Sequence, residues 1–199
     1  MTIARENVFL YVAPESYLDE IGDGNFVAWD LGQGLAITLA GDIGSSVRGI
    51  STDELEALGV LQDEVWSVAI HNVDRLFQNG EFQFKLGNLT SGVEAFIVCN
   101  HWLASAFTLH PACFGLANEA LGSDNLRVLL PSRDNAIIVR AVDYSPDDLA
   151  LLELYRELQY SSRKPFPFNM FILTPDGAQD VHLSASLGPA LGSSGLSTP

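Results

Sequence analysis

Two apolar runs with a short polar break between them constrain this chain most strongly. The runs cover residues 126–130 and 136–142, and the break covers residues 131–135. Short apolar runs bounded by turn residues are typical of buried strands. The sequence therefore predicts two strands that flank a polar loop, and this loop holds Arg133 and Asp134 side by side.

Length and charge limit the classes of function. The chain has 199 residues, of which 47% are hydrophobic, and this is enough for one sizeable core. It carries 25 acidic and 10 basic residues, for a net charge of −15. Because no basic stripe could neutralise phosphates, we expect no direct binding to nucleic acid or to an anionic membrane. The alternative is that the acidic surface attracts a basic partner.

The N-terminal residues lack the basic-then-apolar pattern of a signal peptide, and no stretch approaches the roughly 20 apolar residues of a membrane span. We therefore expect a cytoplasmic protein in which Cys99 and Cys113 are reduced thiols. The sequence leaves the oligomeric state open.

The first half of the chain changes from a strand pattern to a helix pattern. Residues 8–12 read as a strand, and residues 25–40 read as a hairpin that turns at Gly32-Gln33-Gly34. Ser51-Thr52-Asp53-Glu54 is a capping-box pattern that predicts a short helix ending near Leu58. Residues 63–78 then place their apolar side chains on one face at 3.6-residue spacing, which predicts a second helix.

The second half alternates between strands and helices. We expect a hairpin of residues 81–86 and 93–99, followed by a helical stretch over residues 102–121 that Pro111 interrupts. Ser145-Pro146-Asp147-Asp148 predicts the start of the last helix, with Ser145 as the N-cap. Residues 170–173 read as a final strand.

This order of elements predicts an α+β fold, with a mixed, mostly antiparallel sheet and three to five helices packed on one of its faces. A single domain should cover residues 1–183, with a β-rich part over residues 1–50. Residues 184–199 are rich in Ser, Gly, Leu and Pro and carry no charge, so they are expected to form a flexible tail.

Four segments carry a resemblance to a known family. They are residues 68–73 in the predicted helix, Ala104-Ser105-Ala106, residues 129–134 around the polar loop, and residues 168–177. In sequence and placement they resemble the YtpQ-like family of bacterial proteins, over about residues 51–181. The resemblance implies a cytosolic bacterial protein whose family has no assigned reaction.

The polar loop is the first candidate site. Arg133 could offer its planar fork to a carboxylate or phosphate, with Ser132 adding a hydroxyl and Asp134 orienting the guanidinium. His71, on the polar face of its helix, is a further candidate for ligand binding. The alternative is structural, because Pro131 and Asp134 could simply shape a β-turn in which Arg133 pairs with Asp134.

A second constellation consists of Cys99, His101, His110 and Cys113, the ligand types of a structural zinc site. Their spacing is not that of a known zinc finger, and the residues between them are apolar and helix-like. Buried cysteines beside surface histidines account for the pattern, so we expect no metal. The Gly32-Gln33-Gly34 segment lacks the third glycine and the following helix of a dinucleotide site, so no cofactor is expected.

Three functions remain open at this point. The first is a non-enzymatic module that binds a protein partner through Phe166 and Phe168, although at least one of these side chains is expected in the core. The second is a small-ligand-binding protein or an enzyme that uses Arg133, Asp134 and His71. The third is an acidic inhibitor of a basic nucleic-acid-binding protein. The sequence favours a protein without enzymatic activity.

Overall fold

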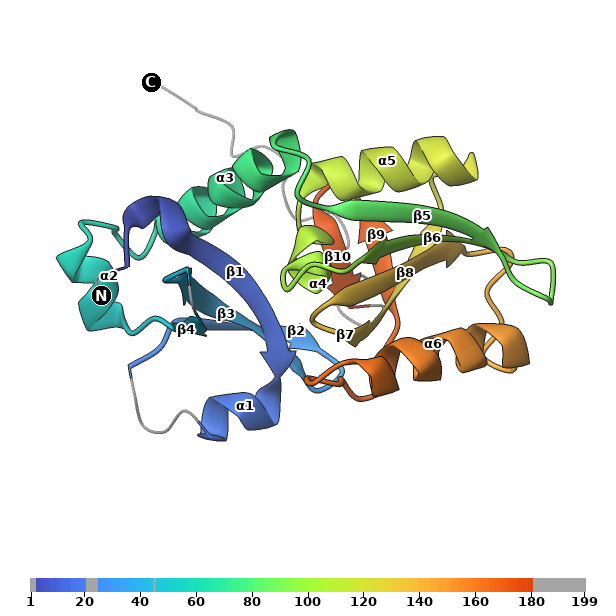
Figure 1. Cartoon of the computed structure of the whole chain (residues 1–199), viewed down its shortest axis with the longest axis horizontal. Coiled ribbons are helices and arrows are strands. Elements are labelled where there is room, and N and C mark those ends of the chain that lie inside the picture. The colour runs from blue at the N-terminus through green and yellow to red at the C-terminus, as the bar shows by residue number, and fades with distance from the viewer. Residues whose placement is uncertain (1–2, 21–24, 45, 181–199) are drawn as a thin grey trace, which may run out of the picture.

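The computed structural model describes residues 3–20, 25–44 and 46–180, which form two antiparallel sheets and six α-helices (Figure 1). The predicted α+β class is confirmed. The strands divide between two sheets instead of forming one, and every strand pair among the described residues is antiparallel.

The first sheet has the order β1-β3-β2, and β4 pairs with β3. Its strands are β1 (Val8–Pro14), β2 (Ala28–Gly32), β3 (Leu35–Asp42) and β4 (Val47–Gly49). The predicted hairpin of β2 and β3 is confirmed. Its tip contains three consecutive residues with positive φ, at +90°, +57° and +75°, which explains the two glycines around Gln33.

The second sheet has the order β10-β9-β7-β8-β6-β5. Its strands are β5 (Gln83–Asn88), β6 (Glu94–Cys99), β7 (Leu126–Ser132), β8 (Asn135–Arg140), β9 (Phe171–Thr174) and β10 (Gly177–Asp180). The two strands predicted around the polar loop are β7 and β8. They extend further into the loop than expected, so only Arg133 and Asp134 remain as the turn between them.

Among the described residues, the helix over Glu15–Glu20 was not predicted and brings the number of α-helices to six, above the three to five expected. The other five begin and end close to their predicted limits, with one exception. The six helices are α1 (Glu15–Glu20), α2 (Thr52–Ala57), α3 (Val65–Gln78), α4 (Ala104–Phe107), α5 (Pro111–Leu121) and α6 (Leu149–Ser161), and a 3₁₀ turn covers Arg5–Asn7. The capping box of α2 is present, with Ser51 and Glu54 bonding each other's backbone N–H. Pro111 divides the predicted helical stretch into α4 and α5, as expected.

The exception is the start of α6, where the predicted N-cap was wrong. Ser145 uses its hydroxyl to accept a bond from the backbone N–H of Asp147, at 3.3 Å, and so closes a local turn ahead of the helix. Asp148 is the N-cap instead, because its carboxylate accepts from the N–H of Leu151 at 3.0 Å.

The helices do not all lie on one face of a sheet, and this prediction was also wrong. α4 and α5 pack in the main core on one face of the six-stranded sheet and α6 packs on the other face, and Figure 1 shows α5 above the strands and α6 below them. The reason lies in β8, where Ala136 and Ile138 face the main core while Ile137 and Val139 face Leu151 of α6. A strand that is apolar on both sides needs cover on both sides.

The hairpin tip of the first sheet ties the two sheets together. The side-chain amide of Gln33 donates to the carbonyl of Met170 at 2.6 Å and accepts from its N–H at 2.9 Å. The main hydrophobic core is shared, since residues of both sheets and of α3, α4 and α5 belong to one buried cluster. This fixes the place where β1 and β3 meet the β7–β8 turn.

Two further predictions concern membrane-spanning segments and the C-terminal tail. Within the described residues, each helix is too short or too polar to cross a lipid bilayer. The tail predicted over residues 184–199 lies outside the described residues.

Candidate functional site

A small cavity lies where the β7–β8 turn meets the first sheet. Its volume is about 180 Å³, which corresponds to about six water molecules at roughly 30 Å³ each. The polar side chains that line it come from five separate segments of the chain, and they are Tyr11, Tyr17, Arg48, Arg133 and Lys164. Three of the chain's 10 basic residues thus gather around one cavity.

Three hydrogen bonds fix the turn that carries Arg133. The Nε of Arg133 donates to Oδ1 of Asp134 at 2.9 Å, and Oδ2 of Asp134 accepts from the hydroxyl of Ser162 at 2.8 Å. The backbone carbonyl of Arg133 accepts from the N–H of Ser105 at 3.0 Å. Asp134 therefore pairs with Arg133 and orients its guanidinium within the turn, which is the pairing that the structural alternative predicted.

Arg133 stays charged in this setting. Burial opposes the charge, but hydrogen bonds to Tyr11 and Asp134 outweigh it and raise the pKa of the guanidinium. Its side chain is 26% exposed, so it is accessible from the cavity while its Nε is held by Asp134. A guanidinium has five N–H donors, and the bonds to Asp134 and Tyr11 leave further donors free to bind an anion.

The opposite wall adds a phenol and an ammonium group. Burial, followed by the nearby Tyr11 and Glu20, raises the pKa of Tyr17, so this side chain is a neutral O–H donor near pH 7. The Nζ of Lys164 lies 5.2 Å from the centroid of the Tyr17 ring, within the range of a cation–π contact. Among the described residues, no carboxylate lies within ion-pair distance of Lys164.

Arg48 contributes less to the cavity than the other two cations. Its guanidinium forms a bidentate pair with the carboxylate of Glu54, at 2.9 Å and 2.5 Å. This pair holds the pKa of Glu54 at about 2, chiefly through the hydrogen bond to Arg48. The positive character of the cavity therefore depends mainly on Arg133 and Lys164.

The structure separates the other predicted ligand residues from this cavity. Ser132 is fully buried, and its hydroxyl accepts from the side-chain amide of Asn135 at 3.2 Å, so it shapes the turn from beneath. His71 lies on the exposed face of α3 and lines a different, open depression of about 620 Å³.

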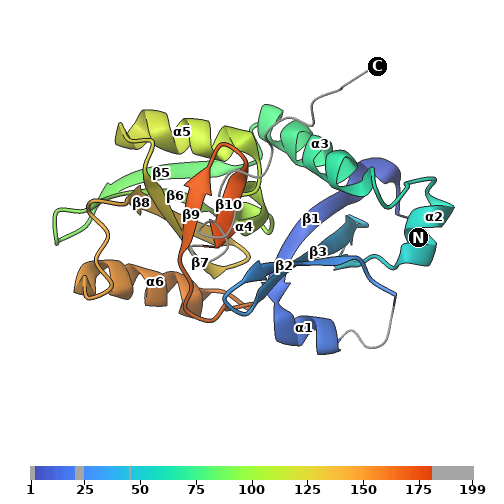
Figure 2. The same cartoon turned by 180° about the vertical axis from the view of Figure 1, so that it is seen from behind.

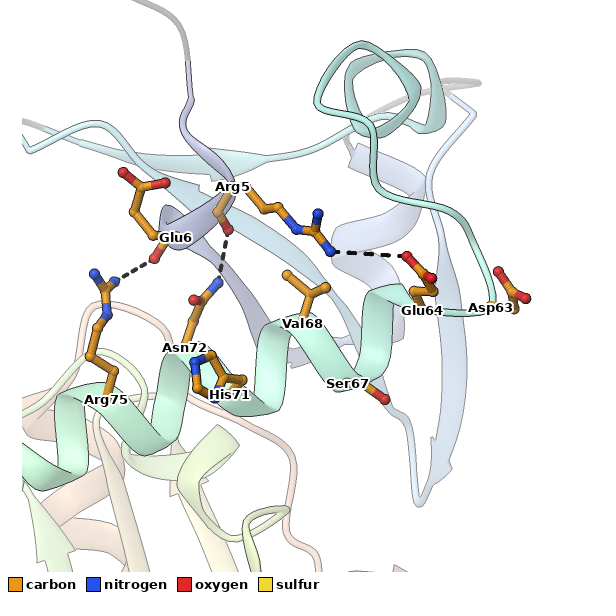
Figure 3. Close-up of a pocket in the computed structure, with 9 residues that line it drawn as sticks. All are labelled: Arg5, Glu6, Asp63, Glu64, Ser67, Val68, His71, Asn72 and Arg75. Atoms are coloured by element: carbon orange, nitrogen blue, oxygen red, sulfur yellow. Dashed lines mark hydrogen bonds and ion pairs between the residues drawn. The ribbon is translucent and has the colours of Figure 1, made fainter.

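That depression lies where the 3₁₀ turn rests on α3 (Figure 3). Its polar groups mainly fasten the two segments together, since Asn72 donates to the carbonyl of Arg5 at 2.9 Å and Arg75 donates to that of Glu6. Arg5 also pairs with Glu64 at 3.9 Å. The depression is larger than the Arg133 cavity, but its charged side chains are of both signs, so it has no net preference for an anion.

The four candidate metal ligands have other contacts. Cys99 and Cys113 are free and buried, and burial raises the pKa of the Cys113 thiol well above its usual range. His101 packs against Phe82 in a tilted arrangement, with ring centroids 4.5 Å apart. His110 caps α5 by accepting from the N–H of Ala112. In the described part of the chain, no three His, Cys, Asp or Glu side chains are grouped as metal ligands.

The two candidate partner-binding residues differ in exposure. Phe166 is 2% exposed and belongs to the main core, as the sequence allowed for one of the pair, so it cannot act as a surface anchor. Phe168 is 51% exposed and packs on Tyr155, with centroids 5.1 Å apart. It lies over a groove of about 320 Å³ beside α6.

Sequence reasoning missed Tyr11, Tyr17, Arg48 and Lys164 as site residues. The only signal for Lys164 was its place two residues before Phe166, a candidate partner-binding residue. The tyrosines carried no signal, because an aromatic residue in an apolar strand or a short helix is usually a core residue.

No family model, curated protein sequence or solved structure matches this chain. The resemblance to the YtpQ-like family stays a prediction.

Proposed function

We propose that this protein binds a small oxyanion, a carboxylate or a phosphate group, in the cavity between the β7–β8 turn and the first sheet. The observation that carries the proposal is the meeting of Arg133 and Lys164 with Tyr11 and Tyr17 in a chain of net charge −15. In a strongly acidic protein, a cluster of cationic side chains around a concave site favours the binding of an anion at that site.

Each side chain has a defined part in the binding. Arg133 presents its N–H fork in an orientation that Asp134 fixes, which reduces the entropy lost on binding. Lys164 exchanges its cation–π contact with Tyr17 for a stronger charge–charge contact. The hydroxyls of Tyr11 and Tyr17 donate hydrogen bonds to the remaining oxygens of the bound anion. The cavity volume, about 180 Å³, limits the ligand to a few heavy atoms or to the anionic end of a larger molecule.

The test is a titration of the whole chain with inorganic phosphate and, separately, with succinate, followed by amide NMR shifts. We expect saturable shifts around the β7–β8 turn. Lys164→Met should weaken binding by about fivefold, because an exposed charge pair is worth up to about 1 kcal/mol. Arg133→Gln should weaken it by about tenfold or more, because a charged hydrogen bond is worth about 1.5–3 kcal/mol.

Lys85→Met is the matched control. Lys85 is the other lysine of the chain, is exposed on β5 and lines none of the cavities described above. Its removal changes the net charge by the same amount and should leave both affinities unchanged. Equal effects of the two lysine variants, or an absence of saturable shifts with either anion, would refute the proposal.

A second candidate function is the binding of a protein partner through Phe168. It is supported by the half-exposed ring over the groove beside α6, and by Leu149 and Tyr160 of the same helix, which are 74% and 83% exposed. Affinity capture with the wild type and with Phe168→Ala tests it, and Phe168 should be required for any stoichiometric partner. The acidic-inhibitor function stays a prediction that only the net charge supports.

A further inference from the structure

A second cavity lies on the other face of the first sheet. Successive residues of a strand point to opposite faces, and Ile37 lines this cavity while its neighbour Thr38 lines the Arg133 cavity. Its volume is about 320 Å³, close to the lower end of the roughly 300–1,000 Å³ that small-molecule sites occupy. The β9–β10 hairpin closes it on the side of the six-stranded sheet, next to β2 (Figure 2).

Two tryptophans form an aromatic wall of this cavity. Trp29 of β2 and Trp66 of α3 meet edge to face, with ring centroids 5.2 Å apart and planes at 89°. Both side chains are only partly buried, so part of each indole faces the cavity. Leu109 and Ala178, both buried, add further apolar surface.

The charged side chains that line this cavity are all carboxylates. Asp30 and Asp176 are exposed at its edge, and Asp180 is 7% exposed. Among the described residues that line it there is no lysine or arginine. The carboxylate of Asp180 lies against Gly32, where an added Cβ would collide with it, so the glycine leaves the room that this side chain occupies.

We propose that this cavity binds a small organic cation, an alkylguanidinium or alkylammonium compound, as a site separate from the oxyanion cavity. An indole face attracts a cation placed within about 6 Å of the ring centroid, and tryptophan is the best of the aromatic residues for this contact. The alkyl part of the ligand contacts Ile37 and Leu109, and the charged end pairs with the carboxylates of Asp30 and Asp176.

The charge of the ligand follows from the lining. A neutral apolar ligand would take water from the carboxylates and offer no bond in return, and an anion would be repelled. A compact cation satisfies both the carboxylates and the indole rings. The size also fits, because about 320 Å³ equals the volume of about ten water molecules at roughly 30 Å³ each.

The experiment compares two probes of nearly the same shape, n-butylguanidinium and the neutral n-butylurea. The full chain has three tryptophans, so three indole N–H resonances are expected, and a Trp102→Phe variant identifies the third. We expect n-butylguanidinium to shift the resonances of Trp29 and Trp66 saturably, and n-butylurea to shift them weakly and without saturation. An absence of saturable shifts would overturn the proposal, and so would equal binding of the two probes.

Two isosteric variants test the role of the carboxylates. Asp30→Asn and Asp176→Asn should each weaken n-butylguanidinium binding about two- to fivefold, the range for one partly exposed charge pair. The Asp30 carboxylate also accepts a bond from the N–H of Gly32 at 2.7 Å, and the asparagine oxygen can keep that bond, so the hairpin should be preserved.

Asp124→Asn is the matched control, because Asp124 is exposed in the loop before β7 and lines none of the cavities described above. It changes the net charge equally and should leave the affinity unchanged. If all three variants weakened binding alike, the effect would be that of net charge and the site would be refuted. Phosphate binding at Arg133 should be unaffected by Asp176→Asn, so each of the two sites can fail without the other.

Discussion

Replacing Asn169 with alanine should destabilise the fold and loosen the oxyanion cavity together. Asn169 is fully buried, and its Oδ1 accepts from the N–H of Leu130 at 2.8 Å. Its Nδ2 donates to the carbonyls of Leu130 and Pro167, at 2.7 Å and 2.8 Å. These bonds serve the part of β7 where pairing with β8 shifts register, between Leu129 and Ser132.

The magnitude can be worked from the partners that remain. In the alanine variant the N–H of Leu130 has lost its acceptor in a buried site, which costs about 1–3 kcal/mol. The two carbonyls lose less, because the hydroxyl of Tyr155 lies 3.3 Å and 2.8 Å from them. The loss of those bonds costs about 0.5–1.5 kcal/mol more. The expected total is about 1.5–4.5 kcal/mol, or a fall in Tm of roughly 3–18 °C for a chain of this size.

The assay is urea unfolding followed by circular dichroism, with the free energy and the slope m both fitted. Asn88→Ala is the control, since Asn88 is exposed at the end of β5 and its replacement should change stability by less than about 0.5 kcal/mol. Asn169 holds Leu130 and Pro167, which lie three residues from Arg133 and from Lys164 respectively. The alanine variant should therefore also bind phosphate more weakly. A loss of stability below about 1 kcal/mol at unchanged m would refute the reasoning, because Leu130 would then have found another partner.

Three further predictions concern single side chains. The pKa of Glu54 is held at about 2, below the ordinary 4.5, by its bond to Arg48, so its stabilising effect is complete above pH 4.5 and is lost as the pH falls toward 2. The Glu54 side chain is 38% exposed, so solvent screening limits its contribution to the free energy of unfolding to about 1 kcal/mol. Glu54→Gln should remove this pH-dependent contribution, which unfolding measured from pH 7 to pH 2 would test. Gly32→Ala should lower the free energy of unfolding by about 2 kcal/mol or more, because φ is +90° at this position. Gly115→Ala within α5 meets no neighbour and should raise the free energy of unfolding by about 0.5–1 kcal/mol. Equal shifts of Tm for the two variants would contradict this. The buried Cys113 thiol should react with an aromatic disulfide reagent only at the rate of unfolding, and rapid labelling of the native chain would disprove its burial.

Much of the local structure could be predicted because its signals act within one or two turns of chain. The capping box at Ser51 begins α2 through bonds to neighbouring backbone N–H groups, and Pro111 begins α5 because its fixed φ suits the first helical position. The apolar stripe over residues 63–78 corresponds to α3, Val65–Gln78. At Ser145 two local signals competed, and the turn closed by its own hydroxyl moved the cap to Asp148.

The candidate site could be predicted only in part. Arg133 and Asp134 were identified because they adjoin each other in a turn between two strands. His71 and Ser132 were grouped with them by residue type, and the fold places one on the far side of α3 and the other beneath the turn. Lys164 carried no pattern of its own.

By itself the sequence determined the α+β class, most helix and strand positions, and an acidic chain that holds one arginine in a tight turn. Only the tertiary structure decided that the strands form two sheets, that helices cover both faces of one of them, and that two cavities of opposite charge lie on the two faces of β3. The physical reason is the separation in sequence between the residues that interact. Hydrogen bonds of caps and turns join residues a few positions apart, whereas a cavity is made by side chains that meet only after the buried faces of distant segments have packed together.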